Sequence, residues 1–165
     1  MQKKKKMLTA IISIIAVIGV FTILGTTTST AQTAPDFSLP NMNGEAVSLS
    51  EFEGKIVIVD FWATWCGPCK MEIPGFVKLQ EKYKDDLVII GISLDQNGPK
   101  AVVPFAKEYK INYPVVYGTG EVVKAYGGVN GIPTTFVIDR KGNIQRKYVG
   151  YRADSVFEQD IKELL

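Results

Sequence analysis

The sequence predicts an α/β domain in which helices flank a mixed central β-sheet, preceded by an N-terminal segment that is not part of the fold. Two apolar runs rich in valine and isoleucine, at 55–61 and 87–93, are typical of neighbouring parallel strands covered on both faces. Nearer the C-terminus, two β-rich runs joined by a short turn predict an antiparallel hairpin. Together these patterns predict parallel and antiparallel strands in one sheet.

Each further element follows from its local pattern. Between the two buried strands, apolar residues recur at helical spacing over 68–83 and predict a crossover helix. The later elements, in order, are a helix over 100–109, a strand over 114–117, a helix over 121–126 and hairpin strands over 134–138 and 144–149. Asp154 is a candidate N-cap for a last helix that ends at Leu165.

The charge and hydropathy pattern of residues 1–31 predicts a signal or membrane-anchor segment. Residues 32–165 are then the folded domain. Four lysines, Lys3 to Lys6, precede an apolar run over residues 8–24 and a polar spacer. That run is long for the apolar part of a signal peptide and short for a helix that spans a membrane. Cleavage near Ala31 and retention as an anchor are therefore both compatible with it. In either case the lysines are expected to stay in the cytoplasm and the domain to be extracytoplasmic.

Composition and charge exclude several classes of function. The 165-residue chain has 19 basic and 17 acidic residues, and without the four N-terminal lysines its formal charge is −2. A near-neutral domain lacks the basic surface of nucleic-acid-binding proteins, so we expect no nucleic-acid partner. Histidine is absent and only two cysteines are present, which excludes histidine-based triads and a four-thiolate metal site within one chain. We expect no metal, and chemistry carried by thiols and carboxylates.

The two cysteines form a Cys-x-x-Cys motif at the start of the crossover helix. Cys66 and Cys69 follow the first buried strand, with Gly67 and Pro68 between them and Trp65 before them. A helix N-terminus favours a thiolate through its unpaired N–H groups and its dipole, so Cys66 is the expected nucleophile. Cys69 is placed to resolve the mixed disulfide. The alternative is an inert structural disulfide, although so short a loop constrains the unfolded chain little.

Two acidic residues near the motif are candidate proton-transfer groups. Asp60 interrupts the first buried strand, where a buried carboxyl would have a raised pKa and could take the proton of Cys69. The alternative is a strand-end aspartate that reaches solvent. Glu72 follows Cys69 by three residues on the same helix. It could move protons at the dithiol or contact a partner, or it could be an ordinary solvated glutamate.

The cysteine motif and a downstream segment together resemble thioredoxins. Residues 59–70, Val-Asp-Phe-Trp-Ala-Thr-Trp-Cys-Gly-Pro-Cys-Lys, are similar to the active-site strand, loop and helix start of thioredoxins, and 131–136, Gly-Ile-Pro-Thr-Thr-Phe, resembles the segment that faces the disulfide. The resemblance implies the thioredoxin fold, a cis bond before Pro133 and an Ile132 backbone that pairs with an incoming peptide. The predicted client-binding residues flank the cysteines or form this bond: Trp65, Gly67, Pro68, Ile132 and Pro133.

The closer similarity is to the TlpA-like and ResA-like thiol-disulfide oxidoreductases, which are exported or membrane-tethered. Residues 34–40 resemble the start of their domain, 69–74 their helix start with its active-site glutamate, and 95–117 their inserted helix and strand. Two features differ from that family as a whole. Asp60 stands where asparagine is frequent, and Gly67–Pro68 is the pair found in thioredoxin itself, whose couple lies at about −270 mV.

The sequence therefore predicts an extracytoplasmic enzyme that reduces client disulfides through a redox-active Cys66–Cys69 disulfide, without a bound cofactor. Its expected partners are envelope clients, apocytochrome c among them in cytochrome c maturation, and a membrane electron donor of thiol type. A disulfide-forming oxidant of the same fold is the main alternative. A thiol peroxidase would need Pro and Thr at positions 59 and 63, which are Val and Ala. A non-catalytic binding module is the last alternative.

Overall fold

The computed structural model describes residues 32–165. The predictions for residues 1–31, including the apolar run and the cleavage site, lie outside the described residues. The elements are β1 (Gln32–Thr33), β2 (Ser38–Pro40), β3 (Ala46–Ser48), η1 (Leu49–Phe52), β4 (Ile56–Trp62), α2 (Gly67–Lys82), β5 (Leu87–Ser93), α3 (Pro99–Glu108), β6 (Val115–Tyr117), α4 (Gly120–Ala125), β7 (Thr134–Ile138), β8 (Asn143–Val149) and α5 (Asp154–Leu164). Within 32–165, none of the helices has both the length and the apolar character needed to cross a membrane.

Six strands form one mixed sheet in the order β1-β8-β7-β4-β5-β6. The strand β4 lies inside this sheet, parallel to β5 and antiparallel to β7. The strand β6 continues the parallel part, and β8 pairs with β7 as the predicted hairpin. The predicted α/β fold with a mixed sheet is therefore confirmed, and its predicted elements agree with the structure to within one or two residues.

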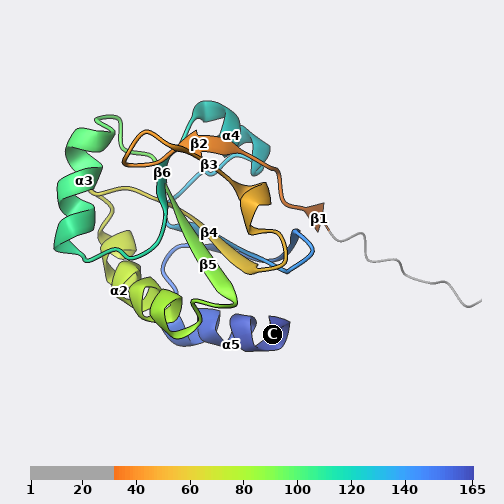
Figure 1. Cartoon of the computed structure of the whole chain (residues 1–165). Coiled ribbons are helices and arrows are strands. Elements are labelled where there is room, and N and C mark those ends of the chain that lie inside the picture. The colour runs from red at the N-terminus through yellow and green to blue at the C-terminus, as the bar shows by residue number, and fades with distance from the viewer. Residues whose placement is uncertain (1–31) are drawn as a thin grey trace, which may run out of the picture. The chain divides into compact units, whose positions relative to one another are not determined.

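The two faces of the sheet are covered by different helices, which Figure 1 shows. Side chains on β4 alternate between the faces. Those of Ile56, Ile58 and Trp62 pack in one core cluster with apolar residues of α2, α3 and α5. Those of Val57, Val59 and Phe61 pack in a second cluster with α4 and the N-terminal part of the domain. Because all seven residues of β4 are buried, this strand belongs to both cores.

The N-terminal strands were not predicted from the sequence. The strands β1, β2 and β3 have two or three residues each, too few to show an alternating pattern. The pair β2–β3 forms a separate antiparallel ribbon, and β1 pairs with β8 at the edge of the main sheet. Phe37, Leu39 and Leu49 from this region are buried against the second core cluster. The segment therefore closes one face of the sheet.

The start of α5 differs from the prediction by one residue. Its N-cap is Ala153, which has no side chain to cap the helix, and Asp154 is the first helical residue. The prediction of Asp154 as N-cap is therefore wrong. Asp154 instead lies against Gly75 of α2, where an added Cβ would stand 2.8 Å from the aspartate Cβ. Its acidic side chain still lies in the first turn, where the helix dipole favours negative charge.

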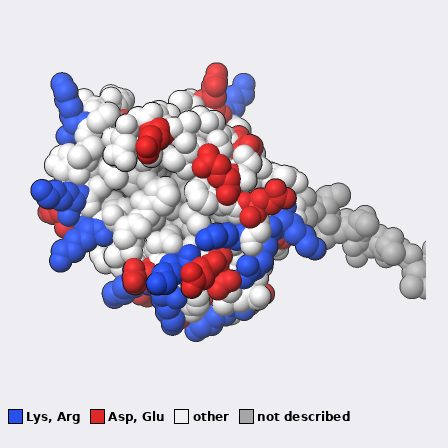
Figure 2. Space-filling model, in the orientation of Figure 1, with Lys and Arg blue, Asp and Glu red and all other residues white. Residues whose placement is uncertain are grey.

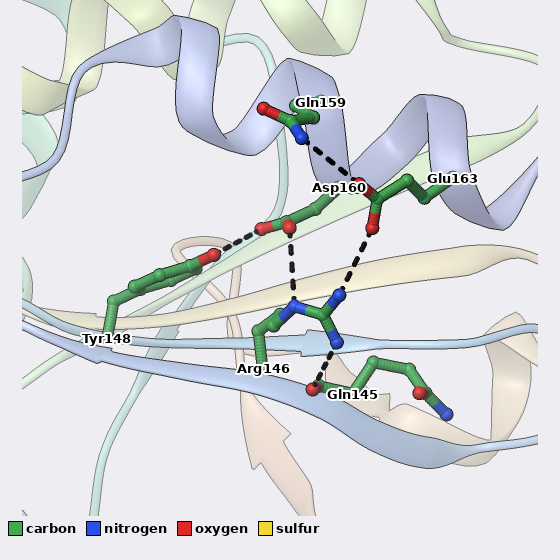
Figure 3. A network of polar contacts seen from close by, with 6 residues as sticks. All are labelled: Gln145, Arg146, Tyr148, Gln159, Asp160 and Glu163. Carbon is green, nitrogen blue, oxygen red and sulfur yellow. Dashed lines mark hydrogen bonds and ion pairs between the residues drawn. The ribbon is translucent and has the colours of Figure 1, made fainter.

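A polar network joins α5 to β8 (Figure 3). The Tyr148 hydroxyl donates to Asp160 at 2.8 Å, and the Arg146 guanidinium lies 3.6 Å from the other carboxylate oxygen. Arg146 also pairs with Glu163 at 3.1 Å, and Gln159 donates to Glu163. Burial raises the pKa of Asp160, while the hydroxyl and the guanidinium act in the opposite direction. The network fixes α5 over the strand that ends beside the Pro133 loop.

Charged side chains are mixed in sign on the face shown in Figure 2. Acidic groups cross the upper half of this view, groups of both signs lie along its lower side, over α2 and α5, and an area at the centre left is uncharged. Basic and acidic groups alternate along the lower side. On this face of residues 32–165 there is therefore no continuous basic patch of the kind that binds a phosphate backbone.

The packing around Gly91 on β5 gives a test of this fold. A Cβ at that position would lie 2.8 Å from Nε1 of the buried Trp62 and 3.4 Å from the Tyr113 ring. Because overpacking a core costs about 1–3 kcal/mol, Gly91→Ala should lower the free energy of unfolding in urea by that amount. In the control Gly120→Ala the new Cβ meets nothing within 4 Å, and the change should stay below about 0.5 kcal/mol. Equal losses in the two variants would contradict the packing described.

Candidate active site

Cys66 and Cys69 form a disulfide at the N-terminus of α2, with their Cα atoms 5.3 Å apart. Cys66 is the N-cap of the helix, and its sulfur accepts a hydrogen bond from the Cys69 backbone N–H at 3.2 Å. Gly67 and Pro68 occupy the first helical turn, where the missing N–H of proline leaves no bond unmade. Cys66 is 5% exposed and Cys69 only 1%. The predicted nucleophile is thus the more exposed of the two cysteines, at the positive end of the helix dipole.

The turn before Cys66 is held by Asp95. The Cys66 N–H donates to the Ala63 carbonyl at 3.1 Å, which closes the turn. The backbone N–H and the hydroxyl of Thr64 both donate to the Asp95 carboxylate, at 2.9 and 2.6 Å. Asp95 follows β5, so these bonds join the carboxyl ends of two parallel strands. The turn presents Trp65, which is 69% exposed, next to the disulfide.

Asp60 is buried on the side of the sheet that carries the disulfide. It is 2% exposed, and its neighbours two residues away along β4 pack in the same core cluster as both cysteines. The alternative of a solvent-exposed strand end is therefore wrong, because the strand continues for two residues beyond it. Burial raises the pKa of Asp60 well above its ordinary value, and the nearby Glu72 raises it further. A hydrogen bond from the Thr135 hydroxyl, at 3.1 Å, acts in the opposite direction.

Glu72 is also buried, with 3% of its surface exposed, so it is not an ordinary solvated glutamate. One carboxylate oxygen accepts a hydrogen bond from the Arg152 backbone N–H at 2.7 Å. The other has no hydrogen-bond partner among residues 32–165. Burial raises the pKa of Glu72 to about 7, against the lowering effect of the Arg152 N–H and charge. A carboxyl with this pKa can both accept and release a proton near neutral pH.

The Pro133 loop is connected to the same region. The Ile132–Pro133 peptide bond is cis, as the resemblance to thioredoxins implied. The Pro133 carbonyl accepts a hydrogen bond from the Gly150 N–H at 2.8 Å, two residues before Arg152. Ile132 is half-buried and packs against the core cluster that contains both cysteines. That this loop and Trp65 bind a client peptide stays a prediction.

Sequence reasoning missed three residues that shape the site. Asp95, Thr135 and Arg152 each contact a predicted site residue or its loop, but they come from 31, 75 and 80 residues further along the chain. The one signal in the sequence was the pair of threonines at the start of the run 134–138. Within residues 32–165, no three His, Cys, Asp or Glu side chains gather in the manner of metal ligands. The groups that the sequence predicts as reactive, the two cysteines and the carboxyls of Asp60 and Glu72, are all buried.

This geometry agrees with comparisons to known proteins. The model of the AhpC/TSA family matches residues 30–147. The chain belongs to this family. The thioredoxin-like protein YneN of Bacillus subtilis is 38% identical over 132 residues, covering 79% of this chain and 77% of YneN. The thiol-disulfide oxidoreductase ResA of Bacillus thuringiensis is 36% identical over 133 residues, covering 79% and 76%.

A solved structure extends this likeness to the fold. A thiol:disulfide interchange protein of the thioredoxin family from Chlorobium tepidum superposes with a TM-score of 0.77 at 35% identity, covering 84% of this chain and 99% of that one. This AhpC/TSA family member therefore has the thioredoxin-like fold and is a thiol-disulfide oxidoreductase, as predicted. Its clients are proteins that carry thiols or disulfides.

The raised pKa of Glu72 predicts how stability depends on pH. Between the ordinary pKa of 4.5 and the folded value of about 7, the folded protein binds more protons than the unfolded one. Stability is therefore lost as pH rises through this window. Glu72→Gln removes the ionisation, so its unfolding free energy relative to the unchanged protein should increase by up to about 3 kcal/mol between about pH 4 and pH 8. Urea unfolding across this range measures the difference, and a constant difference would contradict it.

Proposed function

We propose that this protein reduces the disulfides of client proteins outside the cytoplasm. The observation that carries the proposal is the Cys66–Cys69 disulfide at a helix N-terminus, with Gly67 and Pro68 between the cysteines and Asp60 buried on the same side of the sheet. The same motif gives thioredoxin a couple of about −270 mV, against about −120 mV for a strong oxidant. The sequence also has no histidine to stabilise the Cys66 thiolate further.

In the reduced protein, the Cys66 thiolate attacks one sulfur of the client disulfide. That disulfide breaks, a mixed disulfide forms between Cys66 and the client, and the first client sulfur leaves as a thiolate that takes a proton from solvent. Cys69 then gives its proton to the Asp60 carboxylate and attacks the Cys66 sulfur. The second client thiolate leaves and the Cys66–Cys69 disulfide forms. Two electrons pass from the dithiol to the client.

Glu72 is the group through which we expect protons to reach solvent. Glu72 lines a surface hollow together with Met71, Tyr151 and Arg152. Its raised pKa results from its own burial, and its charge in turn raises the pKa of Asp60. A proton on Asp60 therefore has a second carboxyl nearby to which it can pass. In this scheme Asp60 acts on Cys69 and Glu72 exchanges protons with water.

The expected location of the protein follows from residues 1–31, and its expected partners follow from the redox chemistry outside the cytoplasm. We infer that residues 1–31 direct the domain across the membrane, either as an anchor or as a cleaved signal. Outside the cytoplasm thiols are oxidised, so the protein needs electrons from a membrane donor of thiol type. Apocytochrome c is a fitting client class, because its Cys-x-x-Cys-His haem sites must be reduced before haem attachment.

The reduction potential of the Cys66–Cys69 couple tests the direction of the reaction. We expect a value near that of thioredoxin, about −270 mV, when the purified protein is equilibrated with mixtures of reduced and oxidised dithiothreitol. The oxidised fraction is measured from alkylated thiols. A value near −120 mV would instead indicate a disulfide-forming oxidant.

The roles of the two cysteines are tested by trapping. Cys69→Ser should accumulate a mixed disulfide with a model disulfide client, since the resolving thiol is missing, while Cys66→Ser should trap little. Non-reducing gel electrophoresis separates the adducts, and both variants should lose client reduction by at least about 100-fold. If both variants trapped the client equally, the assignment of Cys66 as nucleophile would be wrong.

A further inference from the structure

Thr135 and its neighbour Thr134 are buried polar residues in β7, whose other three residues are apolar. Thr135 is 1% exposed and lies directly opposite Asp60 in the antiparallel pair β4–β7. Val137, two residues further along β7, packs in the same cluster as both cysteines. Thr135 therefore faces the disulfide side of the sheet, as Asp60 does. Its hydroxyl donates to one oxygen of the Asp60 carboxyl at 3.1 Å.

On the other side of Asp60, the residue of β5 that pairs with it carries no side chain. This residue is Gly91, and the space above this glycine is filled by Trp62 and the Tyr113 ring. The Trp62 indole N–H has no hydrogen-bond partner among residues 32–165. Within the described residues, the hydroxyl of Thr135 is thus the one side-chain group that donates a hydrogen bond to Asp60.

The titratable groups around Asp60 come from two elements besides β4. The helix α2 and its N-cap contribute both cysteines and Glu72, and the negative charge of Glu72 disfavours ionisation of Asp60. The segment before β6 contributes Tyr113, whose own pKa is raised by burial and by the two carboxyls, so that it stays neutral. No lysine or arginine of residues 32–165 is among the groups that shift the Asp60 pKa. The Thr135 hydroxyl is the group that opposes burial and Glu72.

We propose that Thr135 is a positioning residue, whose hydroxyl holds the Asp60 carboxylate in the orientation and ionised form that accept the Cys69 proton. The inference rests on the proposed function, in which Asp60 is the proton acceptor. A hydroxyl that donates to a carboxylate stabilises the charged form more than the neutral acid. In the step concerned, the S–H proton of Cys69 passes to Asp60, the sulfur–sulfur bond to Cys66 forms, and the client thiolate leaves.

The test measures the resolving step alone. Reduced protein reacts with 5,5′-dithiobis(2-nitrobenzoate), and the release of the second thionitrobenzoate from Cys66 by Cys69 is followed by stopped-flow absorbance against pH. Thr135→Val keeps the shape of the side chain and removes the donor. Because this bond favours the ionised acid, its loss should raise the apparent pKa of the step by roughly one pH unit. Thr135→Ser, which keeps the hydroxyl, should restore the original profile.

Two further variants distinguish a purely structural role of the Thr135 hydroxyl from the proposed positioning role. Thr135→Ala should give the same pH shift as Thr135→Val, although it leaves a cavity and loses more stability. In Asp60→Asn, adding Thr135→Val should produce no further shift. If the change in the apparent pKa of the step correlated with the loss of stability of each variant, and not with the loss of the hydroxyl, the inference would be overturned.

The same experiment distinguishes the two levels of the proposal. If Asp60→Asn alters the pH profile and Thr135→Val does not, the inference about Thr135 fails and the role of Asp60 stands. If Asp60→Asn leaves the profile unchanged, the proposed proton acceptor is wrong and the inference falls with it.

Discussion

A strand that is covered on both faces and paired on both edges cannot shift, and β4 is such a strand. A slip by one residue would move each of its side chains into the other core. The pairing with β5 and β7 therefore fixes Asp60 on the side of the sheet where the cysteines lie. It also fixes the end of the strand, from which the turn held by Asp95 leads to Cys66. Both halves of the site, the thiols and the carboxyl, depend on this one register.

The two buried carboxyls are unfavourable for stability and suited to the proton transfers that we propose. The charged form of each group would be better solvated in water. Burial in the folded protein disfavours that charge and so raises the pKa of both carboxyls. Two hydrogen bonds offset only part of the free-energy cost of this burial. The Thr135 hydroxyl donates one to Asp60, and the Arg152 N–H donates one to Glu72. Such incomplete compensation is expected where proton transfer matters, since a fully stabilised carboxylate would be a poor base.

The fold was largely predictable because its long elements have strong patterns. The continuous apolar runs predict β4 and β5, and the position of Cys-x-x-Cys after β4 predicts the reactive end of α2. The short strands β1, β2 and β3 escape such reasoning, since two or three residues show no period. The cap of α5 was misplaced because Asp154 packs against α2 instead. The burial of Glu72 was undecided from spacing alone, because the loop that covers it lies 80 residues further along the chain.

The pairing of β1 with β8 fixes the position of Gln32, the first residue that the structure describes. Gln32 and Thr33 pair with Ile144 and Asn143, at the end of the hairpin farthest from the Pro133 loop. The strand β7 runs antiparallel to β4, so Ile138 at the end of β7 pairs with Val57 near the beginning of β4. The other end of β4 leads to Cys66. Gln32 therefore lies at the pole of the described domain opposite the end of β4 that leads to the disulfide, and the strand β1 leaves the reactive pole uncovered.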